Sequence, residues 1–521
     1  MAQDALTDYD KVAYPSYTHP QTHPDRLAVI GALFGLEPAA INHCRVLELG
    51  CGDGTNLAPM AWALPESEFV GIDLAGSPIR QGQQMVQDLG LGNLRLIQGD
   101  LMEIGGDWSP FDYIIAHGLY SWVQPDVRDH LLGICRGLLA PQGIAFVSYN
   151  ALPGGHLRNM VREMLLFHVR GFEAPEERVR QASALVRFLA QAQNTPNEYR
   201  RLMMVELERI LEHVPGHLYH DELAEINQPI YFTQFMAHAA HHRLQYLGEA
   251  DFFEMSDHAF VDSVKETMDQ LVADRLLREQ YLDFLKCRCF RQTALCRSEA
   301  RLHHEPQAEK IEGFLISSRA LCSPGPLDLR SGVVSVFETP KGAKCQTDLP
   351  AGKAALTILG TAWPMPFPFD QLYQQVRRRL AREGLPADAA GVSRQDLCEF
   401  LLRLYAGGAV EFRTFLPPIA RHAGERPVAH PLARWQAARG DVVTSLFHIA
   451  VKVEDEIGRS LLTWLDGTLE RKALLEKLWG FLESKKALAL PDGDESAARR
   501  ELETNLEKNL EKLARLGLLA G

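Results

Sequence analysis

The feature that most constrains the fold of this chain is a short apolar run followed by three glycines at alternate positions, at residues 45–54 (Arg-Val-Leu-Glu-Leu-Gly-Cys-Gly-Asp-Gly). The apolar residues within 46–49 predict a short, buried parallel strand. Gly50, Gly52 and Gly54 predict a tight turn in which the backbone can come close to a ligand. Such a turn between a strand and a helix indicates a nucleotide-type binding loop, although it lacks the G-x-G-x-x-G spacing of dinucleotide sites. The glycines alone also fit an ordinary tight turn.

The residues that follow supply the rest of the unit to which such a loop belongs. Apolar segments at 69–74, 94–101, 111–117 and 143–150 predict further strands, and 55–64, 77–89 and 126–139 predict the helices between them. Strands that alternate with helices predict right-handed βαβ units, and therefore an α/β domain with a doubly wound, Rossmann-like parallel sheet. Ligands of such sheets bind at the carboxyl ends of the strands, where five polar side chains are expected to lie. They are Glu48, Asp73, Asp100, His117 and Asn150.

The second of the predicted strands ends in a carboxylate at Asp73, 25 residues after Glu48. An acidic residue about 20 residues beyond the glycine loop is placed to bind a ribose diol. Its two acceptor oxygens match the two hydroxyl donors of the sugar. The sequence therefore predicts a ligand that carries a ribose.

The loop pattern E-x-G-x-G-x-G resembles the S-adenosylmethionine (SAM) loop of class I methyltransferases, and residues 45–150 resemble that superfamily. Further motifs extend the resemblance over most of residues 1–300. They are Tyr9-Asp10-x-Val12-x-Tyr14-Pro15-Ser16, 22–27, 117–123, 147–154, His220-Asp221, 229–232 and 283–293. These motifs are similar to those of methyltransferases that carry a methyltransferase regulatory domain, a family that includes bacterial outer-membrane-protein lysine methyltransferases.

The resemblance implies that SAM is the cofactor. The backbone of 50–54 would hold its homocysteine end, Asp73 its ribose hydroxyls, and Asp100 with the backbone of Leu101 its adenine. The residues expected to bind the cofactor are Tyr14, Glu48, Gly50, Cys51, Gly52, Asp53, Gly54, Asn56, Asp73, Leu74, Asp100, Leu101 and His117. The N-terminal segment Tyr9–Pro24 is expected to form a lid over cofactor and substrate. The alternative is an ordinary packing arm.

The residues expected near the methyl acceptor are His117, Tyr120, Trp122, Tyr149 and Asn150. A lysine acceptor must first lose a proton, and both the positive charge of SAM and an apolar pocket lower its pKa. Tyrosine, histidine or backbone carbonyl groups would align the free amine, with bulk water as one acceptor of the proton. Trp122 is expected either to pack against a lysine stem or to fill the core. His117 is expected either to contact a ligand or to orient its loop, and no general base is assigned.

The chain beyond the SAM-binding domain at 1–155 becomes mainly helical, which predicts a regulatory domain at 156–305. Helices followed by a turn and a strand predict two winged-helix-like domains, at 306–425 and 432–521. The terminal helix carries a leucine stripe that is typical of a core or a protein interface. Substrate docking or dimerisation is the expected role of these C-terminal domains.

No metal site is expected. His238 and His242 stand at i and i+4, so they share a helix face, but the H-E-x-x-H pattern is absent and a half-exposed polar face is favoured. The nine cysteines have no regular spacing, which predicts reduced thiols, and Cys287-x-Cys289 does not have the usual zinc spacing. The motif His220-Asp221 is expected to face the active site, because of its place in the family resemblance.

The composition is that of a large enzyme with several domains. The chain has 521 residues, 46% of them hydrophobic, and a net charge of −13. This charge disfavours nucleic acid as the main partner, because phosphate binding needs basic patches, and it fits a cationic substrate slightly better. No apolar run approaches the roughly 18 residues that span a membrane, and the acidic N-terminus has no hydrophobic signal region. A cytoplasmic location is therefore expected.

Three functions stay open on the sequence alone. The first is a protein methyltransferase, directed at lysine by the family resemblance, with cell-envelope proteins among its candidate substrates and a homodimer among its candidate states. The second is a methyltransferase of metabolites or lipid head groups, because the same fold serves both. The third is a scaffold without activity, against which the intact glycines and both cofactor carboxylates argue.

Overall fold

The computed structural model describes residues 7–105, 108–192, 197–272, 274–323, 327–385, 393–487 and 494–521, and these divide into two compact units. Unit 1 contains the described residues of Met1–Ser16, Ile30–Leu57 and Glu66–Pro306. Unit 2 contains Tyr17–Val29, Ala58–Pro65 and the described residues of Gln307–Gly521. Two short segments from the first part of the sequence therefore pack with the C-terminal residues.

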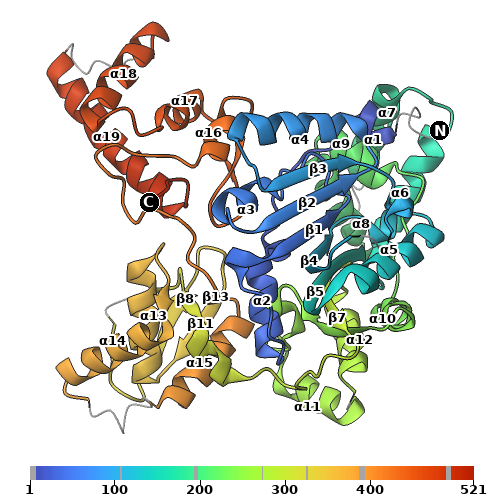
Figure 1. Ribbon diagram of the computed structural model, residues 1–521, viewed down its shortest axis with the longest axis horizontal. Helices are drawn as coiled ribbons and strands as arrows, with labels where there is room; N and C mark the ends of the chain where they lie inside the picture. The colour runs from blue at the N-terminus through green and yellow to red at the C-terminus, as the bar shows by residue number, and fades with distance from the viewer. Residues whose placement is uncertain are drawn as a thin grey trace. The chain divides into compact units, whose positions relative to one another are not determined.

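A seven-stranded sheet forms the centre of unit 1, in the order β3-β2-β1-β4-β5-β7-β6 (Figure 1). Its strands are β1 (Arg45–Leu49), β2 (Glu68–Asp73), β3 (Leu94–Gln98), β4 (Phe111–Ala116), β5 (Leu139–Asn150), β6 (Leu244–Glu249) and β7 (Phe290–Arg297). The strands β1 to β5 are parallel, whereas β7 runs antiparallel to β5 and β6. The strand order reverses between β1 and β4, which places a ligand site at the carboxyl ends of these strands. This is the predicted doubly wound arrangement.

Two strands of this sheet, β6 and β7, come from the region that the sequence predicts as a mainly helical domain at 156–305. Most residues of both strands are buried, but polar side chains such as Glu249 and Arg291 interrupt the continuous apolar run by which a buried strand is recognised in a sequence. The predicted boundary at 155 therefore does not divide the structure, because the strands beyond it complete the sheet of unit 1.

Helices flank the sheet, and some of their ends carry clear capping signals. They are α1 (Asp8–Lys11), α4 (Gly76–Leu89), α5 (Pro125–Leu138), α6 (Gly155–Val169), α7 (Pro175–Gln191), α8 (Glu198–Leu211), α9 (Pro215–His217), α10 (Phe232–His241), α11 (Asp262–Leu271) and α12 (Arg275–Lys286). A π-helix at Leu218–Glu222 follows α9 directly. Gly90 ends α4 with a φ of 65°, a conformation that glycine adopts without strain. The side chain of Asp274 caps α12 by accepting a hydrogen bond from the Leu277 amide. The helix α2 (Pro24–Leu33) is divided between the two units.

Unit 2 contains two small antiparallel sheets, with strand orders β11-β10-β9 and β12-β8-β13, and a two-stranded pair β14-β15. The strands are β8 (Leu315–Ser317), β9 (Leu321–Cys322), β10 (Ser335–Glu338), β11 (Lys344–Thr347), β12 (Phe367–Pro368), β13 (Glu411–Arg413), β14 (Val442–Thr444) and β15 (Ala450–Lys452). The helices are α3 (Ala58–Ala63), α13 (Pro350–Ala362), α14 (Phe369–Arg382), α15 (Arg394–Ala406), α16 (Pro431–Ala437), α17 (Glu456–Trp464), α18 (Arg471–Ser484) and α19 (Glu495–Arg515). Leu506 and Leu510 of α19 are buried in a core with α16, α17 and α18, so the predicted leucine stripe packs inside this unit.

A buried ion cluster fixes β7 in the large sheet. Arg291, which is 1% exposed, lies on β7 and binds Glu249 of β6. It also binds Glu279 and Asp283 of α12, each at 3.0 Å. Because three carboxylates surround one guanidinium, loss of the arginine would leave buried negative charge without compensation.

Replacement of Arg291 by Met is expected to lower the free energy of unfolding by about 3–5 kcal/mol, the typical cost of breaking a buried ion pair. Chemical denaturation followed by intrinsic fluorescence measures the change. Arg136→Met is the matched control, because Arg136 pairs with an exposed glutamate, Glu299, at 2.8 Å and such a pair contributes about 0–1 kcal/mol. Equal effects of the two substitutions would contradict the assigned role of the cluster.

Candidate active site

The glycine loop forms a turn that follows β1, as the sequence predicts. Gly50, Gly52 and Gly54 have φ values of 72°, 57° and 74°, in the left-handed region that favours glycine. A side chain at Gly52 would meet nothing within 4 Å, so the backbone there borders open space. At Gly54 a Cβ atom would lie 2.7 Å from the side chain of Leu96. The loop is therefore packed on one side and open for a ligand above Gly52.

The carboxylate of Asp73 connects the end of β2 to this loop. Its Oδ2 accepts a hydrogen bond from the Gly52 amide at 2.8 Å, and its Oδ1 accepts one from the Ala75 amide at 2.9 Å. Burial raises the pKa of Asp73, while these two hydrogen bonds lower it. Each carboxylate oxygen has a second lone pair, so Asp73 keeps acceptor capacity for two ribose hydroxyls.

Glu48, at the carboxyl end of β1, is a buried carboxyl group with one satisfied oxygen. Its Oε1 accepts a hydrogen bond from Asn56 Nδ2 at 2.8 Å, whereas Oε2 is buried without a hydrogen-bond partner among the described residues. Burial raises the pKa of Glu48 to about 8, the Asn56 hydrogen bond lowers it, and the charges of Asp53 and Asp73 raise it further. A cationic ligand beside Glu48 would stabilise its ionised form.

The remaining residues predicted to bind the cofactor follow the same edge of the sheet. Cys51 is buried, and burial raises the pKa of its thiol well above the usual range. Asp53 accepts a hydrogen bond from the Thr55 amide at 2.9 Å, and Leu74 is 56% exposed beyond β2. Asp100 caps the short 3-10 turn Leu101–Glu103 by accepting a hydrogen bond from the Met102 amide. Their assignment to a cofactor stays a prediction.

The residues predicted near the methyl acceptor separate into two groups. His117, at the end of β4, is half-buried and stacks on Phe146, with ring centroids 5.9 Å apart. Trp122 is also half-buried, in the 3-10 turn Tyr120–Trp122. The side-chain amide of Asn150 donates a hydrogen bond to Asn227 Oδ1 at 2.9 Å. The backbone N–H of Asn150 donates a second hydrogen bond to Ser121 Oγ.

Tyr120 and Tyr149 form the second group, and the structure buries both in the core against Phe235. The Tyr120 hydroxyl hydrogen-bonds His238 Nδ1 at 2.7 Å, and the Tyr149 hydroxyl pairs with Thr293 Oγ1 at 3.1 Å. Burial raises the pKa of Tyr120 to about 12. These contacts are those of packing residues, and a contact of either tyrosine with the methyl acceptor stays a prediction. On β5 the neighbours Tyr149 and Asn150 face opposite sides of the sheet, although both are buried.

The first part of the predicted lid lies beside Asp73. Asp10 Oδ1 accepts a hydrogen bond from the Ser77 amide at 2.7 Å, at the start of α4, just beyond Asp73. Burial raises the pKa of Tyr9 to about 12, and the charges of Asp221 and Asp73 add to the rise. The assignment of this segment as a lid, and not as an ordinary packing arm, stays a prediction. The predicted segment Tyr9–Pro24 is divided at residue 16, because its later residues belong to unit 2.

His238 and His242 meet a third polar side chain that the sequence does not reveal. Asp129 of α5 accepts from His238 Nε2 at 3.1 Å and from His242 Nε2 at 2.8 Å. The three possible ligand atoms lie within 4.8 Å of one another. Hydrogen bonds among the three groups account for this arrangement. All nine cysteines have free thiols in the structure, as the irregular spacing predicts.

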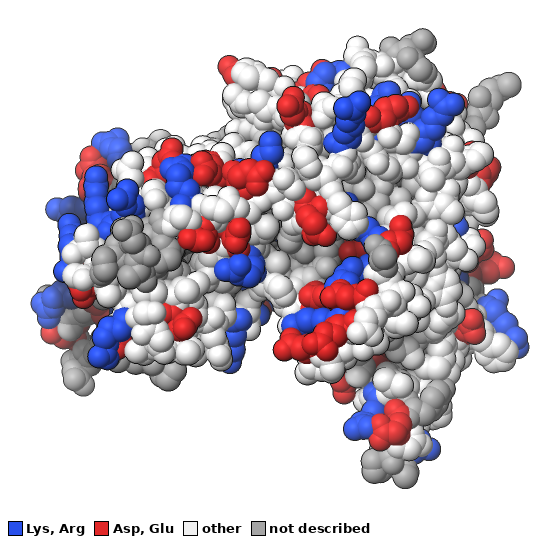
Figure 2. Space-filling model, turned by 90° about the horizontal axis from the view of Figure 1, so that it is seen from below, with Lys and Arg blue, Asp and Glu red and all other residues white. Residues whose placement is uncertain are grey.

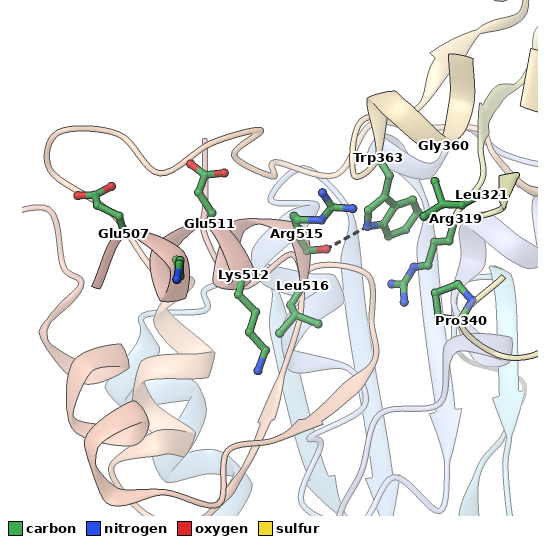
Figure 3. Close-up of a pocket in the computed structure, with 11 residues that line it drawn as sticks. Arg319, Leu321, Pro340, Gly360, Trp363, Glu507, Glu511, Lys512, Arg515 and Leu516 are labelled. Atoms are coloured by element: carbon green, nitrogen blue, oxygen red, sulfur yellow. Dashed lines mark hydrogen bonds between the residues drawn. The ribbon is translucent and has the colours of Figure 1, made fainter. Parts of the chain in front are cut away.

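Unit 2 contains a cavity of about 610 Å³ between α19 and the region around α13 (Figure 3). The Trp363 indole donates to the Arg515 carbonyl at 3.1 Å, and the Arg319 guanidinium lies 4.2 Å from the centre of the Trp363 ring. None of the residues predicted to bind cofactor or acceptor lines this cavity.

On the face in Figure 2, acidic and basic side chains are intermingled among uncharged ones. Among the described residues, no helix is long and apolar enough to cross a membrane.

Comparison with known protein families finds three matches along the chain. Residues 46–143 match a methyltransferase domain, 215–297 a predicted methyltransferase regulatory domain, and 425–518 the C-terminal winged helix domain of PKMT. An uncharacterized protein of Rickettsia prowazekii is 37% identical over 232 residues, which cover 44% of this chain and 93% of that protein. Another uncharacterized protein of the same organism is 28% identical over 98% of this chain and 93% of its own length. The chain belongs to the family of methyltransferases that these three domain matches describe.

A solved structure agrees with the assignment over the whole chain. The structure of PKMT2 from Rickettsia typhi covers 98% of this chain and 100% of its own, with a TM-score of 0.86 and 27% sequence identity. PKMT2 has also been solved in complex with AdoHcy, at the same TM-score and identity. The predictions of a SAM-dependent methyltransferase, a Rossmann-like domain, a regulatory domain and a C-terminal winged helix are therefore confirmed. The regulatory match at 215–297 includes β6 and β7 of the large sheet.

Binding of SAM at pH 7 is expected to release protons, up to about one per molecule bound. With a pKa of about 8, Glu48 is largely protonated in the free protein, and the positive charges of SAM would favour its ionised form. Calorimetry in buffers of different ionisation enthalpy measures the release. Glu48→Gln should remove most of it, whereas Glu37→Gln, at an exposed position, should not. An unchanged release in Glu48→Gln would show that another group loses the proton.

Proposed function

We propose that this enzyme transfers the methyl group of SAM to lysine side chains of a protein substrate. The observation that carries the proposal is the match to PKMT2 from Rickettsia typhi over nearly the full length of both chains, at a TM-score of 0.86. The winged helix domain at 425–518 matches the C-terminal winged helix domain of PKMT, a protein lysine methyltransferase. Similarity therefore includes the accessory domains as well as the common methyltransferase fold.

Methyl transfer requires the protein to perform three tasks. It must hold SAM, aim a neutral amine in line with the methyl–sulfur bond, and exclude water. We assign the binding of SAM to the glycine loop, with Asp73 at the ribose and Glu48 near the cationic end of SAM. The half-buried His117 and Trp122 follow β4 at the same edge of the sheet, where they would border the transferred methyl group.

Cell-envelope proteins are the acceptors to test first, because the motifs at 9–16 and 117–123 resemble those of outer-membrane-protein lysine methyltransferases. The net charge of −13 gives a modest electrostatic preference for basic protein segments.

A homodimer through the C-terminal domains stays a prediction. Sedimentation velocity of the full chain measures its oligomeric state.

Tritium transfer from labelled SAM into bacterial lysate, separated into protein and small-molecule fractions, tests the proposal. Label is expected in discrete protein bands, with mass spectrometry locating the added methyl groups on lysine. Asp73→Ala should reduce the labelling at limiting SAM about tenfold or more, because a charge-assisted hydrogen bond contributes about 1.5–3 kcal/mol. Label confined to metabolites or lipids would instead support the small-molecule alternative.

A further inference from the structure

A cluster of aromatic rings and one carboxylate joins the N-terminal segment to the π-helix Leu218–Glu222. We call it the Tyr9–Asp221 cluster, and it consists of Tyr9, Tyr14, His217, His220 and Asp221. Tyr9 stacks on His220, with ring centroids 4.1 Å apart and planes within 8°. Tyr14 contacts both histidines edge to face, at 5.2 Å and 5.6 Å between centroids. The Tyr14 hydroxyl donates to Asp221 Oδ1 at 3.3 Å.

The cluster is held firmly although part of it faces solvent. His220 Nε2 lies 2.8 Å from the Val12 carbonyl, which ties the N-terminal segment to the π-helix. A side chain at Gly216 would lie 2.5 Å from the Ala13 carbonyl, so only glycine permits this approach. Tyr9 and Tyr14 nevertheless remain 43% and 41% exposed. Large exposed aromatic rings at a rigid position are typical of a binding surface.

The cluster lies next to the proposed ribose carboxylate. The charge of Asp73 contributes to the raised pKa of Tyr9, and Asp10 binds the Ser77 amide at 2.7 Å, directly beyond β2. The charges of both Asp73 and Asp221 act on Tyr9, which belongs to α1. The π-helix that carries Asp221 is a rare form of helix that occurs frequently at functional sites.

We infer that the Tyr9–Asp221 cluster binds the ammonium group of the acceptor lysine, with Asp221 as its counter-ion and the rings of Tyr9 and Tyr14 against its aliphatic stem. This inference rests on the proposed function and names the residues that recognise its substrate. A cation beside tyrosine rings gains cation–π attraction, and a carboxylate that is partly removed from water strengthens the ion pair. The histidines complete the aromatic wall, and burial lowers the pKa of His217 and of His220, so both are neutral at pH 7 and do not repel a cation.

Asp221 also provides a place for the proton that lysine must lose. Burial raises its pKa to about 7, with the charge of Glu222 adding to the rise and the Tyr14 hydrogen bond lowering it. The ammonium proton passes to the Asp221 carboxylate, and the freed lone pair forms the new N–C bond to the methyl group. The C–S bond breaks, its electron pair stays on sulfur, and neutral S-adenosylhomocysteine leaves. The methylated amine carries the positive charge that SAM loses.

The test compares Asp221→Asn with Glu225→Gln in the full chain. Asp221→Asn keeps an oxygen that can accept the Tyr14 hydrogen bond while it removes the charge. Glu225→Gln removes an equal charge at an exposed position four residues further along. Initial rates of tritium transfer are measured against increasing concentrations of total bacterial lysate protein, and calorimetry gives the affinity for SAM.

Asp221→Asn is expected to lower the rate at limiting acceptor protein by about tenfold to a hundredfold, with a smaller loss at saturation. Its affinity for SAM and its thermal unfolding midpoint should equal those of the wild type, and Glu225→Gln should behave as the wild type in every assay. Tyr14→Phe, which keeps the ring, should fall between the two.

Two results overturn the inference, and they differ from failure of the proposed function. If Asp221→Asn labels lysate protein as fast as the wild type, the cluster does not bind the acceptor. If it loses SAM affinity to the same extent as activity, Asp221 serves the cofactor site instead. Absence of protein labelling by the wild type would reject the proposed function itself, before any variant is compared.

Discussion

The carboxylate of Asp73 is the contact on which the geometry of the active-site edge depends. It accepts hydrogen bonds from Gly52 and from Ala75, so one side chain fixes both the glycine loop after β1 and the start of the segment that leads into α4. The loop can adopt this form only because its glycines take positive φ values. A group that organises the loop and keeps free lone pairs would be preorganised for the ribose diol predicted here, which would lower the cost of binding.

The N-terminal segment and the regulatory region both contact the part of the structure that carries this edge. The N-terminal residues reach the start of α4 through Asp10 and continue to the π-helix through the contact of Val12 with His220. The regulatory region in turn supplies β6 and β7 to the large sheet, where Arg291 holds them through buried carboxylates. The regulatory match at 215–297 therefore includes two strands of the same sheet that carries the glycine loop.

Local patterns in the sequence predict most of the catalytic sheet and little of its surroundings. The strand after Arg45, the glycine turn and the carboxylate at Asp73 are signalled by short-range spacing, and the structure has all three. The strands β6 and β7 are not signalled, because buried polar residues such as Glu249 and Arg291 interrupt the apolar run that marks a buried strand. Contacts between distant segments are equally hidden, such as that between Tyr9 and His220, since no local pattern encodes which loops meet.

The residues predicted near the methyl acceptor show the same limit of prediction from sequence. His117 and Tyr120 are close in sequence and belong to one motif, yet the structure leaves His117 half-buried at the end of β4 and places Tyr120 in the core beside His238. The residue types alone suggest catalysis for both. Burial and hydrogen-bond partners, which depend on the complete fold, distinguish a side chain that can meet a substrate from one that packs the interior.

A crystal structure of the full chain with AdoHcy tests the central claim most directly. The account predicts that both ribose hydroxyls lie within about 3.2 Å of the Asp73 carboxylate oxygens, with the homocysteine end over Gly52. It also predicts that Tyr9 and Tyr14 remain beside the ligand, with Asp221 facing the sulfur side. A ligand bound away from the glycine loop, or a ribose without contact to Asp73, would contradict the account.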